Sequence, residues 1–398
     1  MKENKVYYGE YSLEHWINLI LTKDIILPEY QRYFVWTEEQ VFKFIVSIRD
    51  SQFIPPVTIG RYKDKNIIID GQQRLTSLFL AYLGVFPNRE SIKTSSDLYN
   101  GEGEEVEEKD IISANMIEWK LNALTDNGVT KRDIISGINK DNYIYLSNSK
   151  GNNSEVLELM SDEKFMEEHF LGFSYIVPAN DDVKSQQNYY SSLFLNINTS
   201  GTPLSKVESR ESLYYINESY KDLFSPNFIS EFRVDGKKID FVRVLSFLFQ
   251  YKNDGEESSI AKGYARNLDL MEKYFVRFIY DVIEDRESEL FGKFSKIFKD
   301  KGRDELNRLS KNIELMNLSK KYESIIDFDI YIFGLVYFSL FSNKNLDKEK
   351  LDKLKENLSK EINDLKSEEA YRKSPNTIGR TKGRLKSSIE LYEDVFYD

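Results

Sequence analysis

Residues 67–76 combine an apolar run with a cluster of groups that could bind phosphate. Three isoleucines at 67–69 predict a short buried strand, and the apolar spacing after residue 74 predicts a helix, so the polar residues fall at a strand-to-helix turn. Backbone N–H groups and the positive end of the helix dipole favour anions at such a turn. Gly71 would let a ligand approach the backbone, and the planar guanidinium of Arg74 suits phosphate. The predicted site contains Asp70, Gly71, Gln72, Gln73, Arg74 and Thr76.

The same turn also has a purely structural interpretation. Asp70 and Gln73 have the spacing of a helix cap, with Asp70 as the N-cap and Gln73 at the third helical position. Capping gives no reason for Gln72 or Arg74. Capping and ligand binding therefore both remain open on the pattern alone.

A second polar cluster lies at 27–36, upstream of the turn. Glu29 could act as a general base or hold Mg²⁺, and Arg32 could pair with a phosphate. The alternative is a surface ion pair between Glu29 and Arg32 in a strand-to-helix connection, because charges in loops are usually solvated.

A third polar cluster lies at 194–210. A turn at 198–201 precedes another capping pattern, and a structural role in this turn explains the glycine at 201 well. A structural role explains Asn198 and Arg210 less well.

The composition excludes several kinds of site. The 398-residue chain has no cysteine and only two histidines, His15 and His169, which argues against disulfides, thiolate chemistry, zinc sites and a Ser-His-Asp triad. The lack of cysteine also fits a cytoplasmic protein. The longest apolar stretch, 331–341, is too short to span a bilayer, so we expect no membrane partner. The net charge of −11 argues against a nucleic-acid surface over the whole molecule, but it leaves room for a local basic patch.

The pattern along the chain predicts an α+β protein with two domains. We expect an α/β domain over 1–218, with polar insertions near 92–110 and 147–154, and an α-helical domain over 219–398. Thr37 and Gln40 form a capping box, and Gly84 is a plausible helix stop. Strands at 142–146 and 173–177 are expected to join the sheet of the first domain.

The order of the three clusters is more specific than any one of them. It resembles the GmrSD-type restriction endonuclease N-terminal domain family, which is similar to the ParB/sulfiredoxin superfamily and is known for an Asp-Gly-Gln-Gln-Arg motif. The matching positions are Pro28, Tyr30, Gln31, Arg32, Trp36, Pro55, Pro56, Asp70 to Arg74, Asn198, Gly201, Leu204, Glu208 and Arg210. The resemblance covers about the first half of the chain.

This resemblance implies a ParB/sulfiredoxin-like fold and a nucleotide-hydrolysing sensor in bacterial defence against phage, often directed at modified DNA. The substrate would be a nucleoside triphosphate of unknown base, with Mg²⁺ as the expected cofactor. The expected catalytic residues are Asp70, Gln72, Gln73, Arg74 and Glu29, with Asp70 and Glu29 as possible metal ligands. The expected nucleotide-binding residues are Tyr30, Gln31, Arg32, Gly71, Thr76, Asn198 and Gly201.

Two other functions remain open at this point. One is a binding module that recognises nucleotide or DNA without turnover, because the sequence contains no unambiguous general base. The other is a phosphotransferase, because a related serine kinase carries a similar Asp-Gly-His-His-Arg turn.

The second half of the chain contains a basic run that could bind DNA phosphates. Its candidate residues are Arg372, Lys373, Arg380, Lys382 and Arg384. The alternative is a solvated face that balances an acidic protein. Many relatives carry a histidine-rich HNH nuclease module, but this chain has no histidine after His169. We therefore expect no nuclease activity from this chain alone; if DNA is cut, a separate effector or nuclease subunit or an unrecognised site must cut it.

Overall fold

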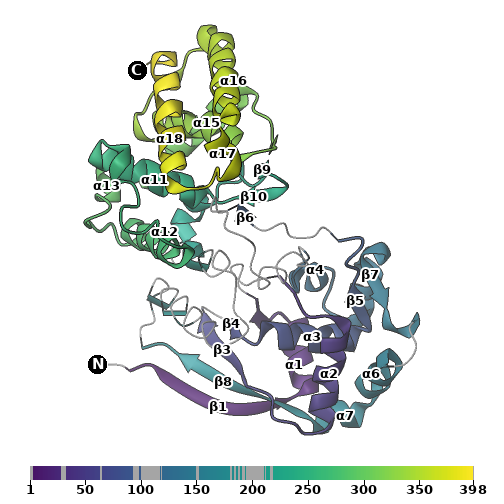
Figure 1. The fold of residues 1–398 in the computed structure, drawn as a ribbon. Coiled ribbons are helices and arrows are strands. Elements are labelled where there is room, and N and C mark those ends of the chain that lie inside the picture. Colours follow the sequence, from purple (N-terminus) through teal and green to yellow (C-terminus); the bar gives the residue numbers. More distant parts are fainter. Residues whose placement is uncertain are drawn as a thin grey trace. The chain divides into compact units, whose positions relative to one another are not determined.

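The computed structural model describes residues 3–27, 33–62, 65–92, 98–99, 117, 119–148, 152–179, 182, 185–186, 189–190, 193, 210, 212–215 and 218–397. The chain divides into two compact units (Figure 1). The first contains residues 1–95 and 112–212, and the second contains residues 96–111 and 213–398. The first unit combines helices and strands and the second is mainly helical, which confirms the predicted α+β fold class.

A five-stranded mixed sheet organises the first unit, in the order β1-β8-β3-β4-β2. The edge strand β1 (Lys5–Ser12) runs antiparallel to β8 (Phe170–Val177), which is parallel to β3 (Val57–Tyr62). Strand β3 forms an antiparallel pair with β4 (Lys65–Asp70), and β4 runs parallel to β2 (Ile25–Ile26). Strand β4 therefore lies inside the sheet, which suits its apolar sequence.

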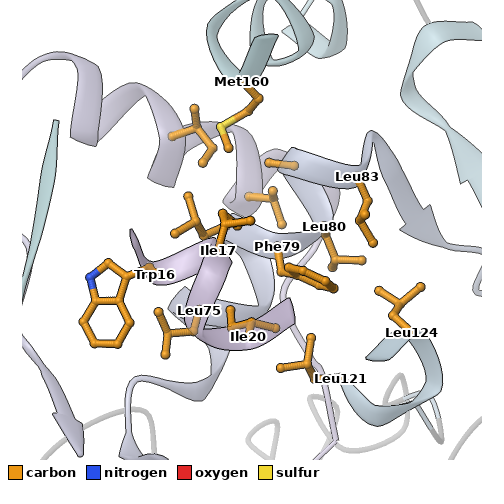
Figure 2. Packing of buried hydrophobic residues seen from close by; sticks show 14 of the residues in the cluster. Trp16, Ile17, Ile20, Leu75, Phe79, Leu80, Leu83, Leu121, Leu124 and Met160 are labelled. Carbon is orange, nitrogen blue, oxygen red and sulfur yellow. The ribbon is translucent and has the colours of Figure 1, made fainter. Parts of the chain in front are cut away.

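Three helices pack against one face of this sheet: α1 (Leu13–Leu21), α2 (Glu38–Arg49) and α3 (Gln72–Leu83). Figure 2 shows side chains of α1 and α3, among them Ile17, Ile20 and Phe79, meeting in this core. The capping box of Thr37 and Gln40 opens α2, and Gly84 ends α3 in a left-handed conformation, so both predictions are confirmed.

The isoleucine side chains of β4 are buried on both faces of the sheet. Ile68 joins the core beneath the helices, whereas Ile67 and Ile69 pack on the other face with Ile176 and Tyr190. Full burial of an isoleucine side chain contributes about 1.5–3 kcal/mol. This anchorage fixes the end of β4 at Asp70, where the candidate site begins.

The remaining elements of the first unit lie beyond α3. A separate two-stranded sheet pairs β5 (Val85–Pro87) with β7 (Tyr143–Tyr145), so the strand expected at 142–146 does not join the main sheet. The other helices are α4 (Asn122–Thr125), α5 (Lys131–Gly137), α6 (Asn152–Ser161) and α7 (Glu163–Glu168). Helix α6 begins inside the polar insertion expected near 147–154.

Helices dominate the second unit. They are α10 (Lys221–Phe224), α11 (Phe241–Asp254), α12 (Leu268–Ile283), α13 (Phe294–Ile297), α14 (Arg303–Met316), α15 (Ile325–Val336), α16 (Leu351–Ser367), α17 (Glu369–Lys373) and α18 (Ile378–Tyr392). A π-helical turn, Tyr337–Phe341, continues α15.

Short strands complete the second unit. One small sheet has the order β11-β9-β10-β6, formed by β6 (Leu98–Tyr99), β9 (Arg233–Val234), β10 (Lys237–Ile239) and β11 (Lys321–Tyr322). A second pairs β12 (Asn345–Leu346) with β13 (Phe396–Tyr397). Strand β6 comes from the segment expected to be a polar insertion of the first domain, and it pairs with β10 of the second unit.

Candidate functional site

The turn between β4 and α3 is built around Gly71. Its φ of +92° is a left-handed conformation that favours glycine, and a Cβ atom there would lie 3.2 Å from Cα of Val57. Helix α3 begins at Gln72, so its N-cap is Gly71, which has no side chain to accept a hydrogen bond from the first turn. The predicted capping pair of Asp70 and Gln73 is therefore wrong, because the helix starts one residue later than that pattern requires.

Asp70 instead holds the Arg74 guanidinium in place. Its Oδ2 atom accepts a hydrogen bond from Nη2 of Arg74 at 2.7 Å, and the carbonyl of Pro55 accepts another from Nη1. The Arg74 side chain is 12% exposed and the Asp70 side chain 34% exposed. Because helical side chains lean toward the N-terminus, this guanidinium adds its charge to the positive end of α3. The two contacts use two of its five N–H donors.

Gln73 is a clamp between α3 and the segment that follows residue 32. Its Oε1 accepts from the backbone N–H of Val35 at 2.9 Å, and its Nε2 donates to the carbonyl of Tyr33 at 3.1 Å. The two partners fix the orientation of the amide, since one is a donor and the other an acceptor. Both ends of the side chain are thus occupied, so Gln73 acts as a positioning residue here.

Arg89 holds the same segment from a second direction. It donates from Nη2 to the carbonyls of Val35 and Trp36, at 3.0 and 3.2 Å. Burial lowers the pKa of Arg89. The backbone N–H of Phe34 also donates to the carbonyl of Trp119 at 3.0 Å. Sequence reasoning did not single out Arg89, because no local pattern signals a lone arginine that bonds backbone carbonyls more than fifty positions away.

The two remaining polar residues of the motif lie in the interior. Gln72 and Thr76 are both buried, unlike Asp70 and Arg74, which reach solvent. The structure therefore pairs Asp70 with Arg74 at the turn and buries the side chains of Gln72 and Thr76.

Several predicted residues lie outside the described part of the chain: Glu29, Tyr30, Gln31, Arg32, Asn198 and Gly201. The described residues on either side of 28–32 do lie along the site. Ile26 pairs with Ile67 of β4, and Tyr33 bonds to Gln73 of α3. Arg210, from the third cluster, lies in the described part of the chain and is buried.

Arg384 is not a DNA-binding residue in this structure, which corrects the sequence prediction. Its side chain is 0% exposed, and its Nε donates to Oδ2 of the equally buried Asp329 at 2.9 Å. Arg243 forms a bidentate pair with the same carboxylate, at 2.7 and 2.8 Å. Burial lowers the pKa of Arg384, and the Asp329 carboxylate opposes that effect. This cluster joins α11, α15 and α18 and leaves Arg384 inaccessible to a phosphate.

The other basic residues of the run have dissimilar surroundings. Arg372 and Lys373 are exposed on α17, where Lys373 pairs with Glu369 at 2.6 Å. Arg380 donates to the carbonyl of Ser374, and Lys382 donates to the carbonyl of Ser258 at 2.8 Å. Burial also lowers the pKa of Lys382. Arg372 and Lys373 are therefore the most accessible members of the run.

Within the described parts of the chain, no group of three or more histidine, cysteine, aspartate or glutamate side chains is placed to hold a metal ion. In the same residues, every helix is too short or too polar to cross a membrane.

Two comparisons with known proteins found matches to part of this chain. A family model described as GmrSD restriction endonuclease, N-terminal domain, matches residues 13–215, which include the whole β4–α3 turn. An uncharacterized protein of Methanocaldococcus jannaschii is 32% identical over an alignment of 96 positions, which covers 18% of this chain and 17% of that protein. No solved structure matches the chain, so the likeness to ParB and sulfiredoxin stays a prediction. The chain belongs to the GmrSD restriction endonuclease N-terminal domain family, which associates it with a restriction system.

Proposed function

We propose that this chain is a nucleotide-binding sensor of a bacterial restriction system and that it hydrolyses a nucleoside triphosphate. The observation that carries the proposal is the Arg74 guanidinium, which Asp70 and the Pro55 carbonyl hold over the first turn of α3. A helix N-terminus and a fixed guanidinium together favour a phosphate group, and Gly71 lets that group approach the backbone.

The proposed roles follow from how each side chain is held. Arg74 binds phosphate, and Asp70 orients it, because a guanidinium already fixed by a carboxylate loses little further freedom on binding. Gln73 ties the segment that follows Arg32 to α3, so Arg32 can supply a second positive charge. Phosphoryl transfer depends chiefly on such positioning and charge neutralisation. Gln72 and Thr76, which are buried near the start of α3, stay candidate site residues, as do Tyr30, Gln31, Asn198 and Gly201.

Mg²⁺ is the proposed cofactor of the reaction. Proteins commonly bind this ion through one or two carboxylates together with substrate phosphates, and it stabilises charge on the transferred phosphoryl group. Asp70 and Glu29 are the candidate carboxylates. Because Asp70 already pairs with Arg74, Glu29 is the better candidate for the metal ligand or the general base.

DNA and a separate effector or nuclease subunit are the proposed macromolecular partners. Membership of a restriction family supports a DNA partner. Arg372 and Lys373 remain candidate phosphate contacts, because they are exposed. Such contacts would bind DNA in a salt-sensitive way and with little sequence information.

Phosphate release from ATP, GTP and CTP, measured with and without DNA, tests the proposal. We expect turnover by the wild type and a loss of about 100-fold or more in Arg74→Ala, the usual effect of removing one fixed charge-stabilising donor. Arg74→Lys should also be impaired, because lysine lacks the planar fork. Equal inactivity of wild type and Arg74→Ala under every condition would overturn the hydrolysis proposal.

A binding module without turnover is the second candidate. The ion pair between Asp70 and Arg74 favours this candidate. Asp70 is the one carboxylate of the described turn, and a carboxylate that is paired with an arginine is a poor general base. Calorimetric binding of nucleotide with no product after long incubation would support it. A phosphotransferase would instead move labelled phosphate onto an acceptor.

A further inference from the structure

Phe53 is an aromatic side chain that the fold leaves almost wholly in solvent. It is 88% exposed, more than any other large hydrophobic residue in the described part of the chain. The ring keeps its apolar faces in solvent, and their burial against a ligand would be favourable.

The loop that displays Phe53 is held at both ends. On one side, Ser51 has a φ of +52°, and the backbone N–H of Gln52 donates to the carbonyl of Ser47 at 2.9 Å. The Ser47 hydroxyl donates in turn to Oε1 of Gln52 at 3.1 Å. On the other side, the Pro55 carbonyl accepts from Arg74, and two consecutive prolines restrict the backbone. The backbone that carries the ring is therefore held on both sides.

This backbone is beside the candidate phosphate site. Phe53 is two residues from Pro55, so their Cα atoms are at most about 7.6 Å apart. Pro55 is itself in hydrogen-bond contact with Arg74. The backbone that carries Phe53 therefore lies beside the residue that holds the Arg74 guanidinium, and a nucleotide is long enough to place its base near this backbone while its outer phosphates contact Arg74.

We propose that Phe53 is the stacking platform for the nucleobase of the nucleotide whose phosphates lie at Arg74. This inference rests on the proposed function and adds the position of the base. Stacking on an aromatic ring tolerates every base, since each has a π face. The site should therefore accept purine and pyrimidine nucleotides with similar affinity.

Calorimetric titration of the full chain with ATP, CTP and inorganic triphosphate tests this inference. Phe53→Ala should weaken binding of both nucleotides by roughly 5- to 150-fold, the usual contribution of base stacking, and leave the affinity for inorganic triphosphate unchanged. Phe53→Trp should retain nucleotide affinity, because it keeps an aromatic face. Tyr8→Ala is a matched control, since Tyr8 is an exposed aromatic residue (78%) on the far edge strand β1.

The possible failures are distinguishable. If the wild type binds neither nucleotide nor triphosphate, the proposed function itself fails. If the wild type binds both and Phe53→Ala binds both as tightly, or loses both equally, only the stacking inference is overturned. A loss of affinity for a single-stranded oligonucleotide without a loss for ATP would also overturn it, because the ring would then serve DNA.

Discussion

The Gln73 clamp gives the most direct test of how this site is assembled. Replacing Gln73 by alanine removes both hydrogen bonds to the segment 33–35. Each such bond contributes about 0.5–1.5 kcal/mol net, so the free energy of unfolding should fall by about 1–3 kcal/mol. Tyr33 and Val35 are only partly buried, which lets water replace some of the lost bonds and favours the middle of that range.

The assay can isolate the first unit. All three tryptophans, Trp16, Trp36 and Trp119, belong to it, so tryptophan fluorescence during urea denaturation reports on this unit alone. With a typical slope of about 1–3 kcal/mol per molar urea, a loss of about 2 kcal/mol lowers the midpoint by about 1 M. Lys43→Ala is a control on the same unit, because its exposed ion pair with Glu39 contributes little.

Gln73→Glu sharpens the test because it changes one atom of the amide. The carboxylate can still accept from Val35 but cannot donate to the Tyr33 carbonyl. A protonated carboxyl could donate, and burial disfavours the charge, so the pKa of the new group should be raised above about 4.3 on folding. The variant should therefore be closest to wild type below about pH 4.3 and lose stability as the pH rises through the folded-state pKa. Wild-type stability of either variant at pH 7 would refute the clamp.

Two further substitutions test the backbone of the turn and the buried charges of the second unit. Gly71→Ala should lower the free energy of unfolding of the first unit by about 1–3 kcal/mol, measured by tryptophan fluorescence, because its φ of +92° disfavours alanine and the added Cβ would crowd Val57. Asp329→Asn should lower the stability of the second unit by about 3–5 kcal/mol, because it leaves the guanidinium groups of Arg243 and Arg384 buried without a carboxylate. Circular dichroism reports the helices of both units, so the transition of the second unit is the part of the change that tryptophan fluorescence does not follow. An unchanged transition would show that the cluster does not hold this unit together.

The local features of the fold could be predicted from sequence. The isoleucines at 67–69 and the apolar spacing after residue 74 located β4 and α3, and Thr37 with Gln40 located the start of α2. These signals come from residues that are close together in the sequence. Over such short separations, side-chain spacing and backbone hydrogen bonding determine the structure directly.

Contacts between distant parts of the chain could not be predicted in this way. The local pattern predicts that Gln73 caps the helix or binds a ligand, but its hydrogen-bond partners lie 38 and 40 residues away. The strand at Tyr143–Tyr145 pairs with β5 because of its tertiary surroundings, and nothing in its own sequence distinguishes that partner from the main sheet. The capping pattern at Asp70 failed for a subtler reason: an aspartate four residues before an arginine also makes a good ion pair.

Arg74 and Arg384 show why residue type alone cannot identify a phosphate site. Both arginines lie on helices and pair with an aspartate. The partner of Arg384 is 55 residues away and the pair is fully buried, so binding an external phosphate would require the core of the second unit to open. The partner of Arg74 is in the preceding turn and the pair reaches solvent, so the guanidinium is both fixed and accessible. Accessibility and fixation together, rather than the presence of a basic residue, are what favour Arg74 as the residue that binds phosphate.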